Sequence, residues 1–307
     1  MARLTGLLLT PGSSTVILFP GMEVLSFARD LLFATFGQII TLFGTLIAFG
    51  SLMHFISRFT SHSLSRAFGT KGIYSVAWLG TPVHEFGHLL FCFIFAHKVM
   101  EVQFFKPDPL TGALGYVRHK WNSNNPWQVI GNFFIGIGPM VIGSVALFAL
   151  FYLLIPDGSE VWRTILGQVD EVQQSDLLGS YIAILRDSLF ALLHAVFTAS
   201  NITSWRFWVF LYISISIASS IRLSTSDLKH SLSGLGCVVL PLLIINLLGM
   251  ANITDPGYIN PFITSSLVAI TSLLVLALLL SLIGFLVTYL MSAIYVKIRY
   301  RYLLNPF

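Results

Sequence analysis

Long apolar stretches constrain this chain more than any other feature of its sequence. Six of them approach or exceed the roughly 20 apolar residues that a helix needs to cross the hydrocarbon core of a bilayer. They lie near residues 35–57, 74–97, 128–155, 205–223, 234–250 and 264–295. Lipid offers no hydrogen-bond partner to the peptide backbone, so these stretches are expected to be helices rather than open strands. The sequence thus predicts an all-α, multi-pass transmembrane bundle of about six spans.

The composition supports a membrane location. Apolar residues make up 55% of the 307 residues, charged residues make up only 10%, and the mean hydropathy is +0.83. Soluble domains carry about 25% charged residues, which excludes a water-soluble protein, and the scattered Lys and Arg exclude a nucleic-acid-binding patch. No repeat or long linker divides the chain, so residues 1–307 are predicted to form a single integral membrane domain.

Two segments depart from the pattern of long apolar helices. Residues 99–128 place Pro and Gly between short apolar and aromatic runs, which predicts a small β-hairpin at the cytoplasmic surface. Its aromatic residues Phe104, Phe105 and Tyr116 are candidates either to pair with an extended substrate or to anchor in the membrane interface. Residues 181–199 contain charged side chains and are expected to form an amphipathic or re-entrant helix rather than a full span.

The distribution of Lys and Arg predicts the orientation of the bundle. With the N-terminus in the cytoplasm, the inside segments hold Arg3, Arg29, Lys98, Lys106, Arg118, Lys120, Arg222, Lys229, Lys297, Arg299 and Arg301. The outside segments hold Arg58, Arg66, Lys71, Arg163, Arg186 and Arg206. Cytoplasmic segments of membrane proteins are enriched in Lys and Arg, so both termini are predicted to be cytoplasmic.

The second apolar stretch contains the sequence His84-Glu85-Phe86-Gly87-His88. Histidines four positions apart lie on one face of a helix, so both imidazoles can bind one Zn²⁺, while the carboxylate between them approaches a water on that metal. About 0.003 such patterns are expected by chance in a chain of this length and composition. A charged side chain at the bilayer centre costs about 2.5 kcal/mol or more, so three ionisable groups here favour a metal site over a structural polar cluster.

A third ligand is expected elsewhere, because a catalytic zinc usually has three protein ligands and one open position. Asp227, which follows the fourth apolar stretch, is the main candidate, and an N-cap of the next helix is its alternative role. Asp255 and Asp108 are weaker candidates. His84 lies about 20 Å along its helix from His97 at 1.5 Å per residue. Asp227 therefore reaches the same ion only if its helix ends inside the protein or the second helix protrudes from the membrane.

In these residues the chain resembles the intramembrane zinc proteases of the site-2 protease class, the M50-type metallopeptidases. That family places HExxH in a spanning helix, takes an Asp from a later helix as third ligand and opens its site toward the cytoplasm. It also has an Asn- and Pro-containing segment before that Asp, which matches residues 131–139 here. Asn132 is thus a candidate to orient substrate or to stabilise an oxyanion, and a hydrogen bond between helices is its alternative role. The family has Gly after the Asp, whereas Leu228 follows Asp227.

The resemblance implies a zinc-dependent endopeptidase that cleaves a peptide bond within or next to the bilayer. Glu85 would activate the attacking water and then protonate the leaving amine. The implied partners are the lipid bilayer and a membrane-protein substrate, and the sequence carries no signal of an oligomeric state. Two other functions are compatible with the residues: a catalytically silent protein of the same family that binds membrane proteins, and a metal transporter. Transport usually needs several ionisable residues along the path, and the other spans carry few.

Overall fold

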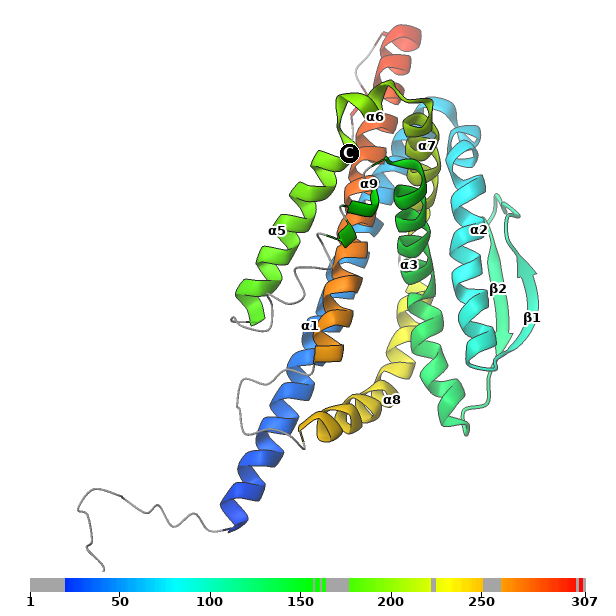
Figure 1. The fold of residues 1–307 in the computed structure, drawn as a ribbon. Coiled ribbons are helices and arrows are strands. Elements are labelled where there is room, and N and C mark those ends of the chain that lie inside the picture. The colour runs from blue at the N-terminus through cyan, green and yellow to red at the C-terminus, as the bar shows by residue number, and fades with distance from the viewer. Residues whose placement is uncertain are drawn as a thin grey trace, which may run out of the picture.

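The computed structural model describes residues 20–156, 158–160, 162–163, 177–221, 225–250, 261–301 and 304–305. They form a helical bundle with a two-stranded antiparallel sheet beside it (Figure 1), which confirms the predicted mostly helical fold with a small hairpin. The helices are α1 (Pro20–Phe68), α2 (Thr70–Ile94), α3 (Pro126–Leu154), α5 (Leu177–Val196), α6 (Ala199–Thr203), α7 (Trp205–Ser220), α8 (Thr225–Met250) and α9 (Pro261–Tyr300). The strands are β1 (Lys98–Gln103) and β2 (Tyr116–Lys120).

Three helices in the described part of the chain are long and apolar enough to cross a membrane. They are Val24–Phe68 in α1, Pro126–Leu154 in α3 and Ala269–Tyr300 in α9. α8 contributes a shorter apolar segment, Gly234–Leu248, and α2 and α7 are not among the candidates. The described residues of the six predicted spans lie mostly in α1, α2, α3, α7, α8 and α9, but the structure does not confirm that there are six spans.

α7 and the start of α8 follow one path along α3. Pairs that lie against each other, in order along α7 and α8, are Phe210 with Phe151, Ile221 with Gly143, Ser231 with Gly136 and Gly234 with Phe133. From the first pair to the last, the residue number in α7 or α8 increases while the residue number in α3 decreases. Both helices therefore run antiparallel to α3. The predicted spans 205–223 and 234–250 are therefore not two passes in opposite directions, as the sequence interpretation had assumed.

α1 and α9 also run in the same direction. The rings of Phe68 and Tyr295 are 4.7 Å apart, and Arg66 donates a hydrogen bond of 3.1 Å to the carbonyl oxygen of Asn305. Residues 20 and 301 consequently lie at opposite ends of the bundle (Figure 1). The prediction put Arg66 outside and the C-terminal segment inside, and these two assignments cannot both be right. The error follows from counting α7 and α8 as separate passes.

The predicted hairpin at 99–128 packs along α2. β1 and β2 pair with Gln103 opposite Tyr116 and Lys98 opposite Lys120, and a bulge lies between Val99 and Glu101. The segment 181–199 is helical, as expected, and falls largely in α5, which packs on α9. Residues 164–176, between α3 and α5, lie outside the described residues.

Close helix contacts at glycines bring α2 against its neighbours. A Cβ placed on Gly87 would lie 2.7 Å from the carbonyl carbon of Gly138 in α3. A Cβ on Gly80 would overlap the carbonyl oxygen of Ser216 in α7. Small residues of this kind allow backbones to approach in membrane helix pairs. As a result, the HExxH turn of α2 lies within hydrogen-bonding distance of main-chain groups on α3 and α7.

Candidate metal centre

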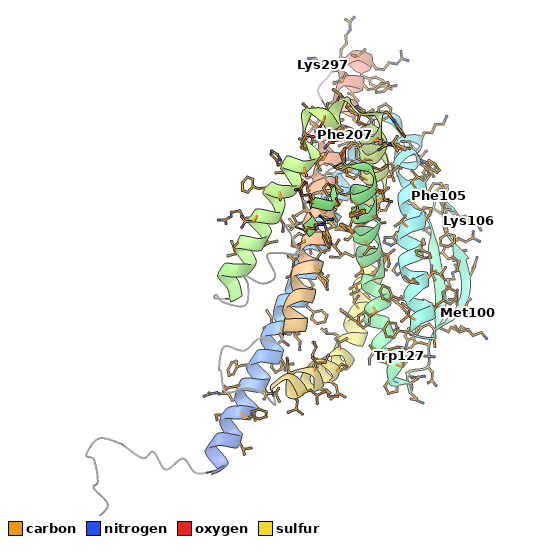
Figure 2. The ribbon with its side chains drawn as sticks, in the orientation of Figure 1. Met100, Phe105, Lys106, Trp127, Phe207 and Lys297 are labelled. Carbon is orange, nitrogen blue, oxygen red and sulfur yellow. The ribbon has the colours of Figure 1, made fainter. Side chains whose placement is uncertain are left out.

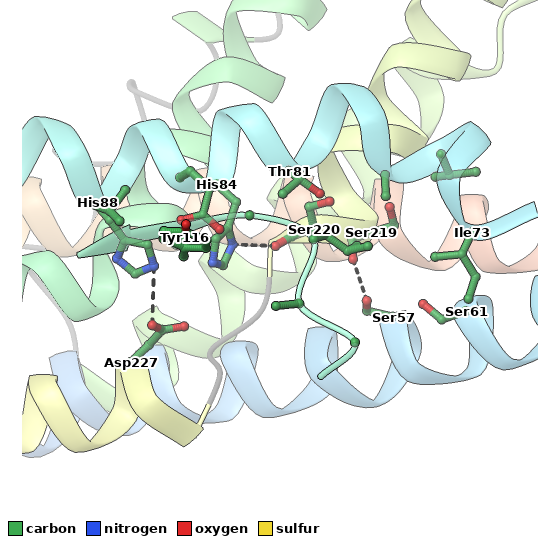
Figure 3. Close-up of a pocket in the computed structure, with 18 of the residues that line it drawn as sticks. Ser57, Ser61, Ile73, Thr81, His84, His88, Tyr116, Ser219, Ser220 and Asp227 are labelled. Carbon is green, nitrogen blue, oxygen red and sulfur yellow. Dashed lines mark hydrogen bonds and ion pairs between the residues drawn. The ribbon is translucent and has the colours of Figure 1, made fainter. Parts of the chain in front are cut away.

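Three side chains meet at the level where α7 ends and α8 begins. His84 and His88 project from α2, and Asp227 comes from the first turn of α8 (Figure 3). Their ligand atoms all lie within 4.8 Å of one another. His88 Nε2 is 3.3 Å from Asp227 Oδ1. The structure thus brings together the three residues that the sequence predicted as metal ligands.

Both imidazoles are oriented through their Nδ1 atoms. His84 Nδ1 lies 2.8 Å from the carbonyl oxygen of Ser220, and His88 Nδ1 lies 2.8 Å from that of Ile135. A carbonyl oxygen can only accept a hydrogen bond, so each Nδ1 carries a proton and donates it. In the neutral ring, Nε2 then holds a lone pair. This is the usual arrangement of metal-binding histidines.

The two carbonyls lack the partner that an α-helix normally supplies. Ile135 would accept from the N–H of residue 139, but that residue is Pro139, which has no N–H. Ser220 is the last residue of α7, where the final carbonyls have no partner inside the helix. Sequence reasoning missed both positions. The Ile135 carbonyl could have been found from the sequence, because a proline within a helix leaves the carbonyl four residues before it without its helical partner.

The distance between His88 and Asp227 suits a shared cation. Neutral Nε2 and a carboxylate oxygen are both acceptors, and they repel at 3.3 Å unless a proton or a cation lies between them. Two ligands on a tetrahedral zinc, each about 2.0–2.1 Å from the metal, are about 3.3 Å apart. An imidazolium–carboxylate ion pair is the alternative, and metal analysis separates the two.

The break between α7 and α8 explains how Asp227 reaches the HExxH turn. α7 stops at Ser220 and α8 starts at Thr225, so the chain interrupts its helix beside the middle of α2. Asp227 is 7% exposed there. A Cβ on Gly136 of α3 would overlap the Asp227 carbonyl oxygen, so the glycine allows this approach. The sequence left two arrangements open, a helix before Asp227 that ends inside the protein or a second helix that protrudes from the membrane. The structure shows the former, because α7 ends beside α2.

Glu85 lies in the wall of a cavity of about 420 Å³ that also includes the three candidate ligands. This volume falls within the usual range of ligand sites. The cavity extends along α2 from His88 toward Ile73, with Ser57 and Ser61 of α1 facing it (Figure 3). Glu85 itself is 6% exposed. The candidate base and the candidate ligands therefore line the same cavity.

The hairpin forms another wall of this cavity. Residues 112–117 and His119 line it. A Cβ on Gly115 would lie 2.9 Å from Glu85 Cγ and 2.7 Å from the carbonyl oxygen of Gln103. The main chain of the hairpin thus packs directly on the candidate base.

The structure does not bring Asn132 to the cavity. This residue of α3 is 2% exposed and is absent from the described lining. Its Oδ1 has no hydrogen-bond partner among the described residues. The arrangement therefore supports neither contact with a substrate nor an interhelical hydrogen bond through that oxygen.

The other two candidates for the third ligand do not join the group. Asp108 lies in the hairpin turn, where it accepts hydrogen bonds from Thr111 Oγ1 at 2.7 Å and Leu110 N at 2.9 Å. These bonds, that of Thr111 above all, lower the pKa of Asp108. Asp255 lies outside the described residues. Asp227 is thus the acidic residue that the described structure places beside the two histidines.

A second cluster escaped sequence reasoning altogether. Cys92, His97 and His119 also have ligand atoms within 4.8 Å of one another. Cys92 follows His88 by four positions and so continues the helix face that carries His84 and His88. That spacing is a sequence signal for Cys92, whereas the two histidines meet it only through the fold.

No protein-family model, curated protein or solved structure matches the chain. The interpretation of the centre therefore rests on its residues and their geometry.

Proposed function

We propose that this protein is a membrane-embedded, zinc-dependent endopeptidase that cleaves a peptide bond within or next to the bilayer. One observation carries the proposal: His84, His88 and Asp227 converge on a cavity that also contains Glu85. The spacing of His84, Glu85 and His88 is that of zinc peptidases. Their placement on apolar helices is what the resemblance to the site-2 protease class leads one to expect.

Each residue has a role in this proposal. His84, His88 and Asp227 would hold Zn²⁺, which when bound polarises the scissile carbonyl and acidifies its water. Glu85 accepts a proton from the attacking water and donates it to the leaving amine. The carbonyls of Ser220 and Ile135 accept from the Nδ1 atoms of the two histidines, so that the Nε2 atoms would bind the ion.

A substrate helix must become extended before cleavage, because helical carbonyls are hydrogen-bonded and shielded. The hairpin loop and the start of β2 line the same cavity as Glu85. An extended segment of a membrane-protein substrate can add to the edge of a strand through main-chain hydrogen bonds. The hairpin is thus the element proposed to hold the substrate beside Glu85.

The proposal also includes a bilayer around the bundle, with the C-terminal end of α9 at the cytoplasmic side. Exposed basic residues at that end are Arg66, Lys71, Arg206, Lys297, Arg299 and Arg301. Those at the opposite end are Arg29, Lys98 and Lys120 (Figure 2 labels Lys297 and Trp127 near the two ends). The positive-inside rule favours this orientation. The cavity extends from His88 toward Ile73, hence toward the proposed cytoplasmic side.

Two measurements on the detergent-purified protein test the proposal. Elemental analysis of the wild type, His84→Ala, Asp227→Ala and Glu85→Gln should show that only the two ligand variants lose a zinc ion. Incubation with membranes, followed by mass spectrometry of newly formed peptide termini, should reveal products for the wild type. Glu85→Gln should lower their rate by about 10²–10⁴-fold, the usual contribution of a general base.

The alternatives give different results. Zinc content that is the same in the wild type and both ligand variants would overturn the metal centre and leave the imidazolium–carboxylate pair. Equal cleavage by the wild type and Glu85→Gln would overturn the role of Glu85. Bound zinc without any cleavage by the wild type would favour the catalytically silent protein.

A further inference from the structure

The C-terminal end of α2 carries a cluster that the proposed peptidase mechanism does not use. Cys92 is fully buried in α2, His97 follows the helix, and His119 lies on β2. Their ligand atoms lie within 4.8 Å of one another. His97 Nδ1 and His119 Nδ1 are 3.0 Å apart.

A main-chain carbonyl sets the protonation of His97. Its Nε2 lies 2.7 Å from the carbonyl oxygen of Gln128, to which it must donate. In the neutral ring, Nδ1 therefore directs a lone pair at His119 Nδ1. Two nitrogen ligands on a tetrahedral zinc are about 3.3 Å apart, close to the observed separation. A single proton shared between the rings is the alternative.

The backbone is shaped to bring His97 back to Cys92. Ala96 has φ 55°, a left-handed conformation that residues with a Cβ rarely adopt. This turn allows the N–H of His97 to donate a hydrogen bond of 2.8 Å to the Cys92 carbonyl. Gly131 of α3 leaves room for the ring, because a Cβ there would lie 2.9 Å from His97 Nε2. The N–H of Ala96 donates to the Phe93 carbonyl as well, so the two bonds form the usual Schellman ending of a helix, and this ending places His97 beside the last turn of α2.

We propose that Cys92, His97 and His119 form a second metal site, for a transition-metal ion of the zinc or copper class. One thiolate and two imidazoles are donors that these ions prefer. On binding, the Cys92 thiol releases its proton to solvent and the sulfur bonds to the metal. The ion would join α2 to β2 and so hold the hairpin wall, which His119 shares with the cavity. This proposal stands independently of peptidase activity.

Cobalt substitution tests the site, because a thiolate bound to Co²⁺ gives a charge-transfer absorption in the near ultraviolet. The set of His84, His88 and Asp227 contains no sulfur and cannot produce it. The full-length protein in detergent, loaded with Co²⁺, should show this absorption, and Cys92→Ser and His119→Gln should lose it. Cys237→Ser, which changes the other cysteine of the chain, and His84→Ala should keep it. Without cobalt treatment, Cys92→Ser should hold about one zinc or copper ion fewer per chain than the wild type.

The outcomes separate this site from the proposed peptidase centre. Lack of thiolate absorption in the loaded wild type, or its persistence in Cys92→Ser, would overturn the second site. Cys92 is buried, so Cys92→Ser can lose the absorption through misfolding. His119 is partly exposed on the hairpin, so loss of the absorption in His119→Gln would show the loss of a ligand. If the absorption is present but His84→Ala loses no metal, the second site stands and the peptidase centre fails.

Discussion

His84 and His88 owe their orientation to two main-chain carbonyls that are left without helical partners. The Ile135 carbonyl has no helical partner because Pro139 lacks an N–H, and the Ser220 carbonyl has none because α7 ends. Each carbonyl accepts the Nδ1 proton of one imidazole, so that in the neutral ring the lone pair is on Nε2. At the scale of single residues, the candidate centre thus depends on a proline that acts indirectly. Pro139 makes no described hydrogen bond to a candidate ligand or to Glu85, but it leaves the Ile135 carbonyl to His88.

Replacing Pro139 tests this dependence. In Pro139→Ala, the new N–H can donate to the Ile135 carbonyl and compete with His88 Nδ1. Loss of such an orienting partner typically lowers metal affinity by about 10–100-fold. The affinity is measured by competition with a zinc chelator.

A matched control is Pro241→Ala, which removes another proline within a helix, in α8. Its zinc affinity should equal that of the wild type. If Pro139→Ala binds zinc as tightly as the control, the Ile135 carbonyl is not what positions His88.

At the scale of elements, the hairpin is the part of the fold whose position the site depends on most. Its main chain contacts Glu85 at Gly115, and its strands pack against α2. The helices alone would leave that side of the cavity open. Changes in the hairpin should therefore alter cleavage without removing metal from the candidate ligands.

Gly115→Ala should separate the hairpin from Glu85. The added Cβ would lie 2.9 Å from Glu85 Cγ and 2.7 Å from the Gln103 carbonyl oxygen, so one of the two must move. A displacement of about 1 Å near a reacting group can cost on the order of 10²-fold in rate. We expect such a loss of cleavage with unchanged zinc content. Gly44→Ala is the control, because its Cβ meets no atom within 4 Å, and equal rates for the two variants would contradict the prediction.

The hairpin should also lose stability in acid. Tyr116 donates a hydrogen bond to Glu101, and this bond, aided by the charge of Arg118, lowers the pKa of the Glu101 carboxyl. A carboxylate whose folded pKa is lowered stabilises the fold above its unfolded pKa, about 4.3, and loses that contribution as the pH falls through the folded value.

The Glu101→Gln variant provides the comparison. Its Tm should lie below that of the wild type at pH 7, and the gap should shrink as the pH falls below about 4. Since the pair is exposed, the gap at neutral pH should be small. A gap that stays constant down to pH 3 would show that the Glu101 charge does not contribute.

At the scale of the whole molecule, the directions of the helices decide which ends share a side. α1 and α9 are parallel, and α7 and α8 descend together along α3. The two ends of the described chain are consequently far apart. Basic residues gather at the end that holds residues 66–71 and 297–301.

Thiol labelling in intact cells tests the resulting orientation. A cysteine introduced at Arg301 should react with a membrane-impermeant reagent only after the membrane is opened, because that end is proposed to face the cytoplasm. A cysteine at Ser123, in the exposed segment between β2 and α3, should react from outside. The unmodified protein controls for Cys92 and Cys237, and the reverse labelling pattern would contradict the orientation.

The amino-acid sequence by itself determined the elements and the first part of the candidate centre. Apolar length specifies helices because lipid and core offer no other partner to the backbone. The spacing of His84 and His88 specifies a shared face because a helix repeats every 3.6 residues. The Pro and Gly signals between short runs likewise predicted the hairpin. All of these are local properties, readable within a few turns of chain.

Only the tertiary structure decided what depends on distant segments meeting. It set the depth of Asp227, since that depth follows from where α7 breaks beside α2. It showed Asn132 buried away from the cavity, because the face that a residue of an almost wholly apolar helix presents depends on its neighbours. It also brought Cys92 beside His119 and put the C-terminal segment at the same end of the bundle as Arg66. The hydropathy pattern of one helix does not specify which other helix it packs against, so these contacts could not be predicted from the sequence.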